Sequence, residues 1–191
     1  MPIPIVIHPE CESFSELVSE AWTCAHSNIV ESSSGTYYMK EGFDHENIYF
    51  WDTCFMVQYA KYAPDIFPGI ESLDNFYAIQ RKDGYIPRCY NLMKQSEPEY
   101  AGSHGNCNPP LAAWCEYDHV RQNGNIERIE KVLPHLVAFD KWLEKTQQRK
   151  DGSWWFSDGA ASGMDNSPRT ARRNKFGNDV GWVDLAAQQA L

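Results

Sequence analysis

The segment Ser162-Gly163-Met164-Asp165-Asn166-Ser167-Pro168-Arg169 places one carboxylate between a glycine and a proline, shortly after the aromatic run Trp154-Trp155-Phe156. Gly163 can adopt backbone angles that other residues avoid, and Pro168 cannot continue a helix. We therefore expect an irregular turn that holds Asp165 in a fixed place. A carboxyl group that large aromatic side chains partly desolvate has a raised pKa and is suited to donate a proton. An ordinary turn, which the same residue types favour, is the alternative.

Length and charge exclude several classes of protein. The 191 residues suit a single domain, 1–191, and no linker divides them. Lys and Arg number 17 against 26 Asp and Glu, a net charge of −9, which argues against nucleic acid or an anionic membrane as partner. No apolar run approaches the roughly 20 residues that a membrane span needs. The chain has 7 Trp and 10 Tyr, and such rings often line carbohydrate sites because they stack on sugars, although filling of the core explains most of them individually.

No metal or cofactor is predicted. The six cysteines form no Cys-x-x-Cys pair, and Cys54 lies in an apolar helical pattern typical of a small core residue. His104, His119 and His135 have no mutual spacing that suggests a metal site. The first seven residues do not resemble a secretory signal, so we expect a cytoplasmic location.

Apolar periodicity predicts an all-α fold built of paired helices. Helices are expected over residues 10–30, 54–60, 69–80, 111–122, 126–147 and 178–191. Asn123-Gly124-Asn125 is expected to separate the fourth and fifth helices. The last residues carry no glycine, proline or basic stop signal, so we expect the sequence to end inside a helix, as a truncated chain would.

Four motifs of this chain resemble those of one enzyme group. They are Tyr49-Phe50-Trp51-Asp52-Thr53, Asn108-Pro109-Pro110, Ser162-Gly163-Met164-Asp165 and Val183-Asp184-Leu185. In that order they resemble motifs of trehalases and the related processing α-glucosidases, glycoside hydrolase families 37 and 63, which include mannosyl-oligosaccharide glucosidases. The resemblance covers roughly residues 42–191 and suggests the N-terminal part of the catalytic domain.

The resemblance implies an (α/α)6 toroid, of which this chain would hold about half. It also implies an inverting hydrolase that cleaves α-linked glucosides or related small glycosyl compounds. Such enzymes use a carboxylic acid on one side of the bond and a carboxylate that activates water on the other. Asp165 would be the general acid, and the catalytic base would lie outside this chain.

The same resemblance suggests the residues that bind the sugar. Trp51 and Asp52 would hold it in the cleaved subsite, and Asn108 would hydrogen-bond it. Tyr49 and Gly163, which belong to the same motifs, are further candidates. Arg88 is a looser match that would donate a hydrogen bond to a sugar hydroxyl group.

Structural roles compete with these assignments. Trp51 and Asp52 have the alternative of a buried ring and a helix cap, although the site is favoured for both, and Asn108 is explained equally well as a residue that fixes the turn before Pro109. A surface or ion-pairing role is the alternative for Arg88. Surface, ion-pairing or capping roles are favoured for two residues near the motifs: Arg169 and Glu46.

The chain also departs from the trehalase pattern. Trehalases carry an acidic residue four positions before the general acid, where this chain has Ala161, and their arginine clamp is incomplete here. A broader α-glucosidase or a hydrolase of small glycosyl compounds is therefore preferred. The alternatives are a non-catalytic carbohydrate-binding module of the same fold, a sugar isomerase or epimerase, and a helical scaffold, which would show a repeat period. Truncation would also leave apolar faces uncovered, through which the chain can self-associate.

Overall fold

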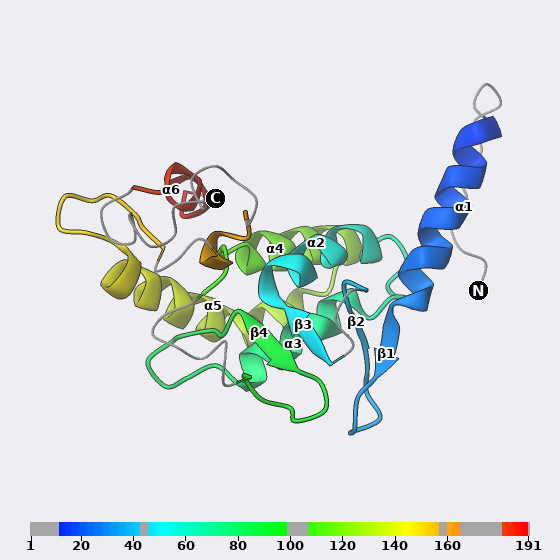
Figure 1. Cartoon of the computed structure of the whole chain (residues 1–191), viewed down its shortest axis with the longest axis horizontal. Helices are drawn as coiled ribbons and strands as arrows, with labels where there is room; N and C mark the ends of the chain where they lie inside the picture. Colours follow the sequence, from blue (N-terminus) through cyan, green and yellow to red (C-terminus); the bar gives the residue numbers. More distant parts are fainter. Residues whose placement is uncertain (1–11, 43–45, 99–106, 157–159, 165–180, 191) are drawn as a thin grey trace.

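Four helices, α2 to α5, form the body of the protein in the computed structural model, which describes residues 12–42, 46–98, 107–156, 160–164 and 181–190 (Figure 1). The described part is mostly helical, as the sequence predicts. Its helices are α1 Glu12–Ser27, α2 Phe50–Ala60, α3 Gly69–Ala78, α4 Ala112–Asn123, α5 Ile126–Gln147, the 3₁₀ turn Ala160–Ser162 and α6 Val183–Gln188. Its strands are β1 Ile29–Glu31, β2 Tyr37–Met39, β3 Asn47–Tyr49 and β4 Cys89–Asn91.

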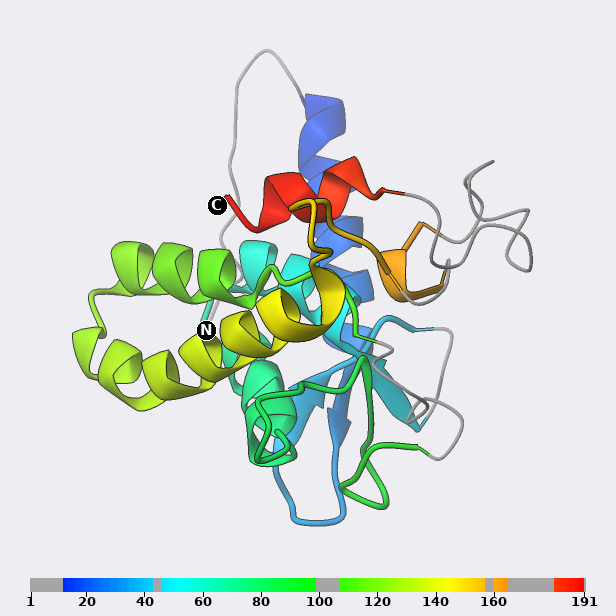
Figure 2. The same ribbon diagram turned by 90° about the vertical axis from the view of Figure 1, so that its left-hand side faces the viewer.

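Helices α4 and α5 form the hairpin expected from the sequence (Figure 2). Gly124 ends α4 in the left-handed region with φ +75°, where glycine avoids the steric cost of a Cβ. The side chain of Asn125 then caps α5 by accepting a hydrogen bond from the Arg128 backbone N–H at 3.3 Å. No helix in the described ranges is both long and apolar enough for a membrane crossing.

The first helix differs from its prediction. It ends at Ser27, because Ile29–Glu31 forms strand β1, which pairs antiparallel with β2. Phe14 and Leu17 lie on one apolar face of the helix by their spacing in the sequence, yet each is 60% exposed. Figure 1 shows the reason, since α1 projects away from the other helices. Only its last turns pack on the body, where the Trp22 ring stacks on Phe67 with centroids 5.0 Å apart.

Two small antiparallel sheets add to the predicted all-α architecture. β1 pairs with β2 in a local hairpin, whereas β3 pairs with β4 across a long separation in sequence. In the second sheet Tyr49 lies opposite Cys89. This pairing has no local sequence signal, because the two strands are far apart along the chain. Its consequence is that the segment before β4 lies beside the start of α2.

Helix α2 lies at the centre of the core and packs against both α3 and α4. Its buried residues recur at spacings of three or four and form one broad face, whereas Phe55 on the opposite side is 44% exposed. The Phe50 ring makes edge-on contacts with Phe76 of α3 and Phe139 of α5, with centroids 5.2 and 5.8 Å away. Cys54 is fully buried, which confirms its interpretation as a core residue.

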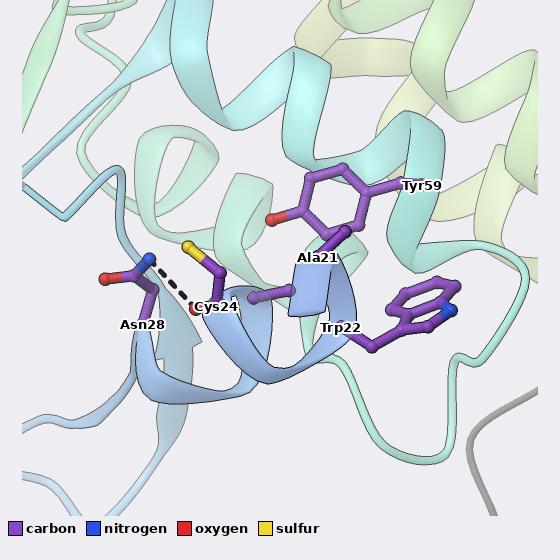
Figure 3. A pocket seen from close by; sticks show the side chains of 6 residues that line it. Ala21, Trp22, Cys24, Asn28 and Tyr59 are labelled. Carbon is purple, nitrogen blue, oxygen red and sulfur yellow. Dashed lines mark hydrogen bonds between the residues drawn. The ribbon is translucent and has the colours of Figure 1, made fainter. Parts of the chain in front are cut away.

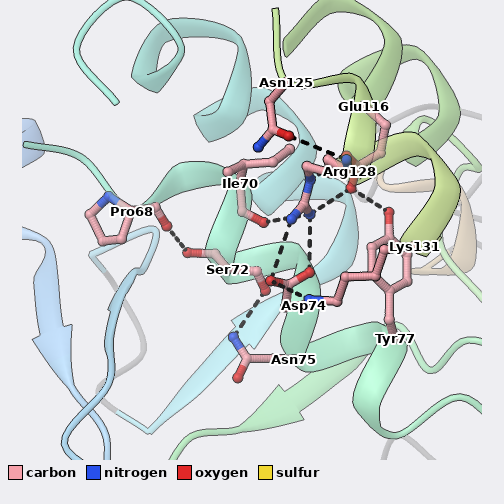
Figure 4. A network of polar contacts seen from close by, with 10 residues as sticks. All are labelled: Pro68, Ile70, Ser72, Asp74, Asn75, Tyr77, Glu116, Asn125, Arg128 and Lys131. Atoms are coloured by element: carbon pink, nitrogen blue, oxygen red, sulfur yellow. Dashed lines mark hydrogen bonds and ion pairs between the residues drawn. The ribbon is translucent and has the colours of Figure 1, made fainter. Parts of the chain in front are cut away.

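A buried ionic network joins α3, α4 and α5 (Figure 4). Glu116 is fully buried, and both of its oxygens accept from Arg128, Oε2 from Nε at 2.6 Å and Oε1 from Nη2 at 2.8 Å. Tyr77 donates its hydroxyl to Glu116 at 2.9 Å, and Asp74 accepts from Arg128 at 3.0 Å. Burial alone would lower the pKa of Arg128, but the two carboxylates outweigh that effect and raise it.

The turn at Gly84 packs closely against α5, and a substitution at Gly84 tests how much this contact contributes to stability. Gly84 has φ +99°, and a Cβ there would stand 2.1 Å from the Ala138 carbonyl oxygen. Gly84→Ala should therefore lower the free energy of unfolding by about 2–4 kcal/mol, from the backbone conformation and the clash together. Chemical denaturation measures this loss.

The matched control is Gly124→Ala. Gly124 also has a positive φ, but nothing lies within 4 Å of its Cβ position. Only the conformational cost of about 1 kcal/mol should apply there. Equal losses in the two variants would show that contact with Ala138 does not constrain Gly84.

Candidate active site

The predicted site residues that the structure describes gather around the N-terminus of α2. Tyr49 is the N-cap, with extended angles φ −111° and ψ 138°, and it provides no side-chain cap. The N–H groups at this end instead find acceptors elsewhere in the chain. Tyr49 donates to Glu41 Oε1 at 2.9 Å, and Phe50 donates to the Arg88 carbonyl at 2.8 Å. The helix start is therefore held by segments before and after it in sequence.

Arg88 reaches this position through the β3–β4 pairing. Tyr49 lies opposite Cys89, so the preceding residue meets the first turn of α2. The Nε and Nη1 atoms of Arg88 are shielded from solvent, although the residue as a whole is only half-buried. The structure thus places Arg88 next to the Tyr-Phe-Trp-Asp motif.

Asn108 connects two of the predicted motifs. Its side chain is buried, with 4% of its surface exposed. Oδ1 accepts from the Trp51 backbone N–H at 3.5 Å, and Nδ2 donates to the Ala161 carbonyl at 3.4 Å. Both contacts are at the long end of the hydrogen-bond range. Asn108 therefore lies between the first turn of α2 and the segment that leads into Asp165.

Gly163 packs directly on the indole of Trp51. A Cβ on Gly163 would stand 2.8 Å from Cε2, 2.9 Å from Cδ2 and 3.0 Å from Nε1 of that ring. With φ +70° the residue also occupies the left-handed region. Two requirements therefore favour glycine here, the backbone conformation and the lack of space. The other neighbour of the indole is Phe55, edge-on with ring centroids 4.7 Å apart.

A side-chain hydrogen bond stabilises the turn at residues 162–164. Ser162 is fully buried and its Oγ accepts from the Met164 backbone N–H at 3.1 Å. This local bond is typical of a serine that shapes a turn. The predicted general acid Asp165, together with Arg169 and His104, lies outside the described residues.

Asp52 and Glu46 differ in their surroundings. Asp52 is half-buried in the first turn of α2, where the helix dipole favours a negative charge. Glu46 is exposed, which fits the solvated role favoured for it.

The fourth motif, Val183-Asp184-Leu185, forms the first turn of α6. The preceding residue, Trp182, donates its backbone N–H to the Trp154 carbonyl at 2.8 Å, and its ring lies edge-on to Phe156 with centroids 5.5 Å apart. Leu185 is fully buried in the core. The motif is thus joined to the aromatic run that precedes the Asp165 segment.

Cys54, His119 and His135, which the sequence singled out, all lie in the described part of the chain. Burial, and after it the neighbouring Cys115, raises the pKa of the Cys54 thiol, so it stays protonated. Burial lowers the pKa of His119, and His135 bonds Gln80 Oε1 through Nδ1 at 2.6 Å. Within the described ranges no three His, Cys, Asp or Glu side chains cluster in a way that suits a metal ion.

A pocket between α1 and α2 lies apart from these motifs (Figure 3). It measures about 440 Å³ and is lined by Ala21, Trp22, Cys24, Ala25, Asn28 and Tyr59. Asn28 Nδ2 is engaged with the Cys24 carbonyl at 3.1 Å, and burial, followed by Cys24, raises the pKa of Tyr59 to about 12. A sugar site needs several convergent polar groups, and this mainly apolar lining does not supply them.

Sequence reasoning missed several residues of this arrangement. Phe55 follows Trp51 by four positions on a helix, and that spacing predicts contact between the two rings. No sequence pattern indicates Glu41, because its hydrogen bond with the Tyr49 backbone N–H depends on the tertiary path of the chain between the two residues.

Comparison with known proteins agrees with the geometry. The profile of the mannosylglycerate hydrolase MGH1-like glycoside hydrolase domain matches residues 47–187, most of the chain. The chain belongs to this family of glycoside hydrolase domains. The match begins at β3 and ends in α6, so it includes all four motifs and leaves α1 and the β1–β2 hairpin outside.

Two solved structures share the fold of this MGH1-like chain. The family 63 mannosylglycerate hydrolase of Thermus thermophilus, in complex with glucose, superposes with a TM-score of 0.60 at 18% identity, over 78% of this chain and 41% of that one. An uncharacterized conserved protein of the same organism gives a TM-score of 0.59 at 18% identity, over 78% of this chain and 39% of that one.

One curated relative is also similar to this MGH1-like chain. It is an uncharacterized protein of Borreliella burgdorferi, 27% identical over 99 residues, which are 52% of this chain and 21% of that protein. The chain thus spans about a fifth of the length of this relative and about two fifths of the length of the solved structures. The expected glycoside hydrolase family is confirmed by the profile match, and the solved family 63 structures share the fold.

Proposed function

We propose that this chain forms part of the catalytic domain of an inverting glycoside hydrolase, with Asp165 as its general acid. The observation that carries the proposal is the contact of Gly163 with the Trp51 indole. It joins the Ser-Gly-Met-Asp segment to the Tyr-Phe-Trp-Asp motif, and Asn108 hydrogen-bonds both. Three motifs of one glycoside hydrolase group that meet at one helix end are consistent with a shared site.

The architecture we propose is a partial (α/α)6 toroid that occupies residues 1–191 as one domain, the N-terminal part of a longer catalytic domain. The α4–α5 hairpin and the central position of α2 are consistent with it. An apolar groove of about 290 Å³ supports the idea that further structure covers this half. It lies between α4, α5 and α6, and two of its lining residues, Leu133 and Val137, are 50% and 42% exposed. Self-association through this face is the alternative use.

The chemistry needs a proton donor and a water-activating carboxylate. Asp165 would give its proton to the glycosidic oxygen as the bond to the anomeric carbon breaks. Water would attack that carbon from the opposite face while a base takes its proton. The two carboxyl groups of an inverting enzyme stand roughly 6.5–9.5 Å apart, and we place the base outside this chain. Hydrolysis of this kind requires no cofactor.

The substrate we propose is a small α-linked glycosyl compound. Tyr49, Asp52 and Arg88 offer a hydroxyl, a carboxylate and a guanidinium near the start of α2, which suit sugar hydroxyls. Mannosylglycerate, the substrate in the name of the similar Thermus enzyme, is the first compound to test, and α-glucosides follow. Ala161, in place of the acidic residue of trehalases, makes trehalose itself a weaker candidate. We expect no nucleic-acid or membrane partner and a cytoplasmic location.

The deciding experiment begins with the intact mass of the protein from its native source. A mass well above the 21.9 kDa of this chain is expected, because the catalytic base must come from additional sequence. The intact protein is then assayed on mannosylglycerate, trehalose and aryl α-glucosides, and the anomer released first is identified by NMR. Release of the inverted anomer supports the proposal. Binding of sugars without cleavage would favour the non-catalytic module, and interconversion of free sugars would favour an isomerase.

A further inference from the structure

The Asn108 amide is engaged by the chain itself. Its side chain is 4% exposed, and its oxygen and nitrogen contact the backbone at Trp51 and Ala161. A residue that hydrogen-bonds a substrate must present a polar atom to the space that the substrate fills. Burial between two backbone segments suits Asn108 poorly to the sugar-binding role expected from the sequence.

Helix α2 requires such a contact. The first N–H groups of a helix have no partner within the helix, and the N-cap Tyr49 does not supply one through its side chain. Asn108 accepts from the Trp51 N–H across a separation of 57 residues. It therefore serves as a cap supplied from outside the helix.

The same amide anchors the segment that precedes Asp165. Nδ2 of Asn108 holds the carbonyl of Ala161, and two residues later Gly163 rests on the Trp51 indole. Ala161 and Ser162 are fully buried, which leaves this segment little freedom to shift. Residues 161–164 are thus attached at two points to the first turn of α2.

We propose that Asn108 and Trp51 are positioning residues that fix the segment 161–164 relative to the start of α2. The inference rests on the proposed function, because it supposes that the position of Asp165 matters for catalysis. In this inference, Asn108 and the side of Trp51 that faces Gly163 hold the segment in place within the site. Sugar contacts then fall to the other side chains around the start of α2.

The kinetic test uses Asn108→Ala and Gly163→Ala in the intact native protein. A misplacement of about 1 Å can cost roughly 10²-fold in rate, so we expect kcat to fall about 10²-fold in each variant. KM and the dissociation constant for glucose should change less than about twofold, because binding energy common to ground and transition states is kept. A large rise in KM with kcat retained would overturn the proposal and return Asn108 to the sugar-binding residues.

Matched controls separate positioning from loss of stability. Asn75 is equally buried, at 4% exposure, and lies in α3, so Asn75→Ala removes a buried amide far from the site. Gly152 has φ +84° with nothing within 4 Å of its Cβ position, so Gly152→Ala tests the backbone conformation without a clash. Both controls should keep kcat within about twofold of the parent rate. If they lose as much as the Asn108 and Gly163 variants, positioning is refuted.

Asn108→Asp covers the case in which Asn108→Ala fails to fold. Aspartate keeps an oxygen that accepts from the Trp51 N–H but lacks the N–H that holds the Ala161 carbonyl. The buried carboxylate costs stability, so kcat is compared under conditions where circular dichroism shows the variant to be folded, and we expect it to lose most of the kcat that the alanine variant loses. Full turnover in Asn108→Asp would show that the contact with Ala161 does not position the segment.

A readout independent of activity distinguishes failure of the proposed function from failure of this inference. The protein is labelled with 5-fluorotryptophan, and the ¹⁹F signal of Trp51 is identified from Trp51→Phe. That signal should move in Gly163→Ala and Asn108→Asp and stay in place in Gly152→Ala and Asn75→Ala. If it responds in this way but the parent protein cleaves no glycoside, the positioning contact stands and the proposed function fails. If the parent is active and the signal does not respond, the positioning inference fails.

Discussion

Asp165→Asn is expected to remove almost all turnover from the intact protein while leaving its affinity for glucose unchanged. Asparagine matches aspartate in size but has no acidic proton to give to the departing oxygen. General acid catalysis typically contributes about 10²–10⁴-fold, so kcat should fall by that factor. Steady-state kinetics on the best substrate of the panel, with isothermal titration of glucose, measure both quantities.

The leaving group provides an internal check on this prediction. An aryl α-glucoside with an acidic phenol departs without much protonation, so the Asp165→Asn variant should lose far less activity on it. The control Asp151→Asn changes an exposed carboxylate whose pKa is lowered by hydrogen bonds to Ser153, and it should keep full turnover. If turnover survives in Asp165→Asn, this residue is not the acid. A parallel loss of glucose affinity would make it a sugar-binding residue instead.

Glu116→Ala is expected to be among the most destabilising single changes in the described structure. It leaves the Arg128 guanidinium, whose side chain is 9% exposed, without the carboxylate that accepts two of its hydrogen bonds. Removing one partner of a buried ion pair costs about 3–5 kcal/mol, and the remaining contact of Arg128 with Asp74 should keep the loss near the lower end of that range. Chemical denaturation should show a loss of this size.

Two comparisons test the cause of that loss. The double variant Glu116→Leu/Arg128→Met removes both charges and should lose less than the sum of the single changes, since apolar residues often replace a buried pair at little cost. Arg81→Ala breaks a pair with Glu97 in which Arg81 is 49% exposed, so its cost should stay below about 1 kcal/mol. If Glu116→Ala costs no more than Arg81→Ala, the network does not hold α3, α4 and α5 together.

The agreement between sequence and structure follows the range of the interactions involved. Helix α5 has the predicted bounds, because its capping residue, its apolar periodicity and the preceding Gly124 all lie within one short segment. The end of α1 was predicted wrongly, because Ile29–Glu31 pairs with a later strand. The exposure of Phe14 and Leu17 is likewise a tertiary result, since periodicity shows an apolar face but not what covers it.

The candidate site shows the same division. Motif resemblance predicts Trp51, Asn108 and Gly163 in one site, and in the structure Trp51 contacts both Asn108 and Gly163. What these residues do there did not follow from the motifs. Asn108 was expected to contact the sugar, whereas its buried amide bridges two backbone segments.

By itself the sequence determined the helical class, the hairpin of α4 and α5, the family motifs and the acidic net charge. Each of these is encoded in local pattern or in overall composition. Only the tertiary structure decided that α2 is capped from Glu41, Arg88 and Asn108, and that Gly163 must lack a side chain because the Trp51 ring occupies its space. Those contacts join residues that are distant in sequence, and no local sequence pattern predicts the packing that brings them together.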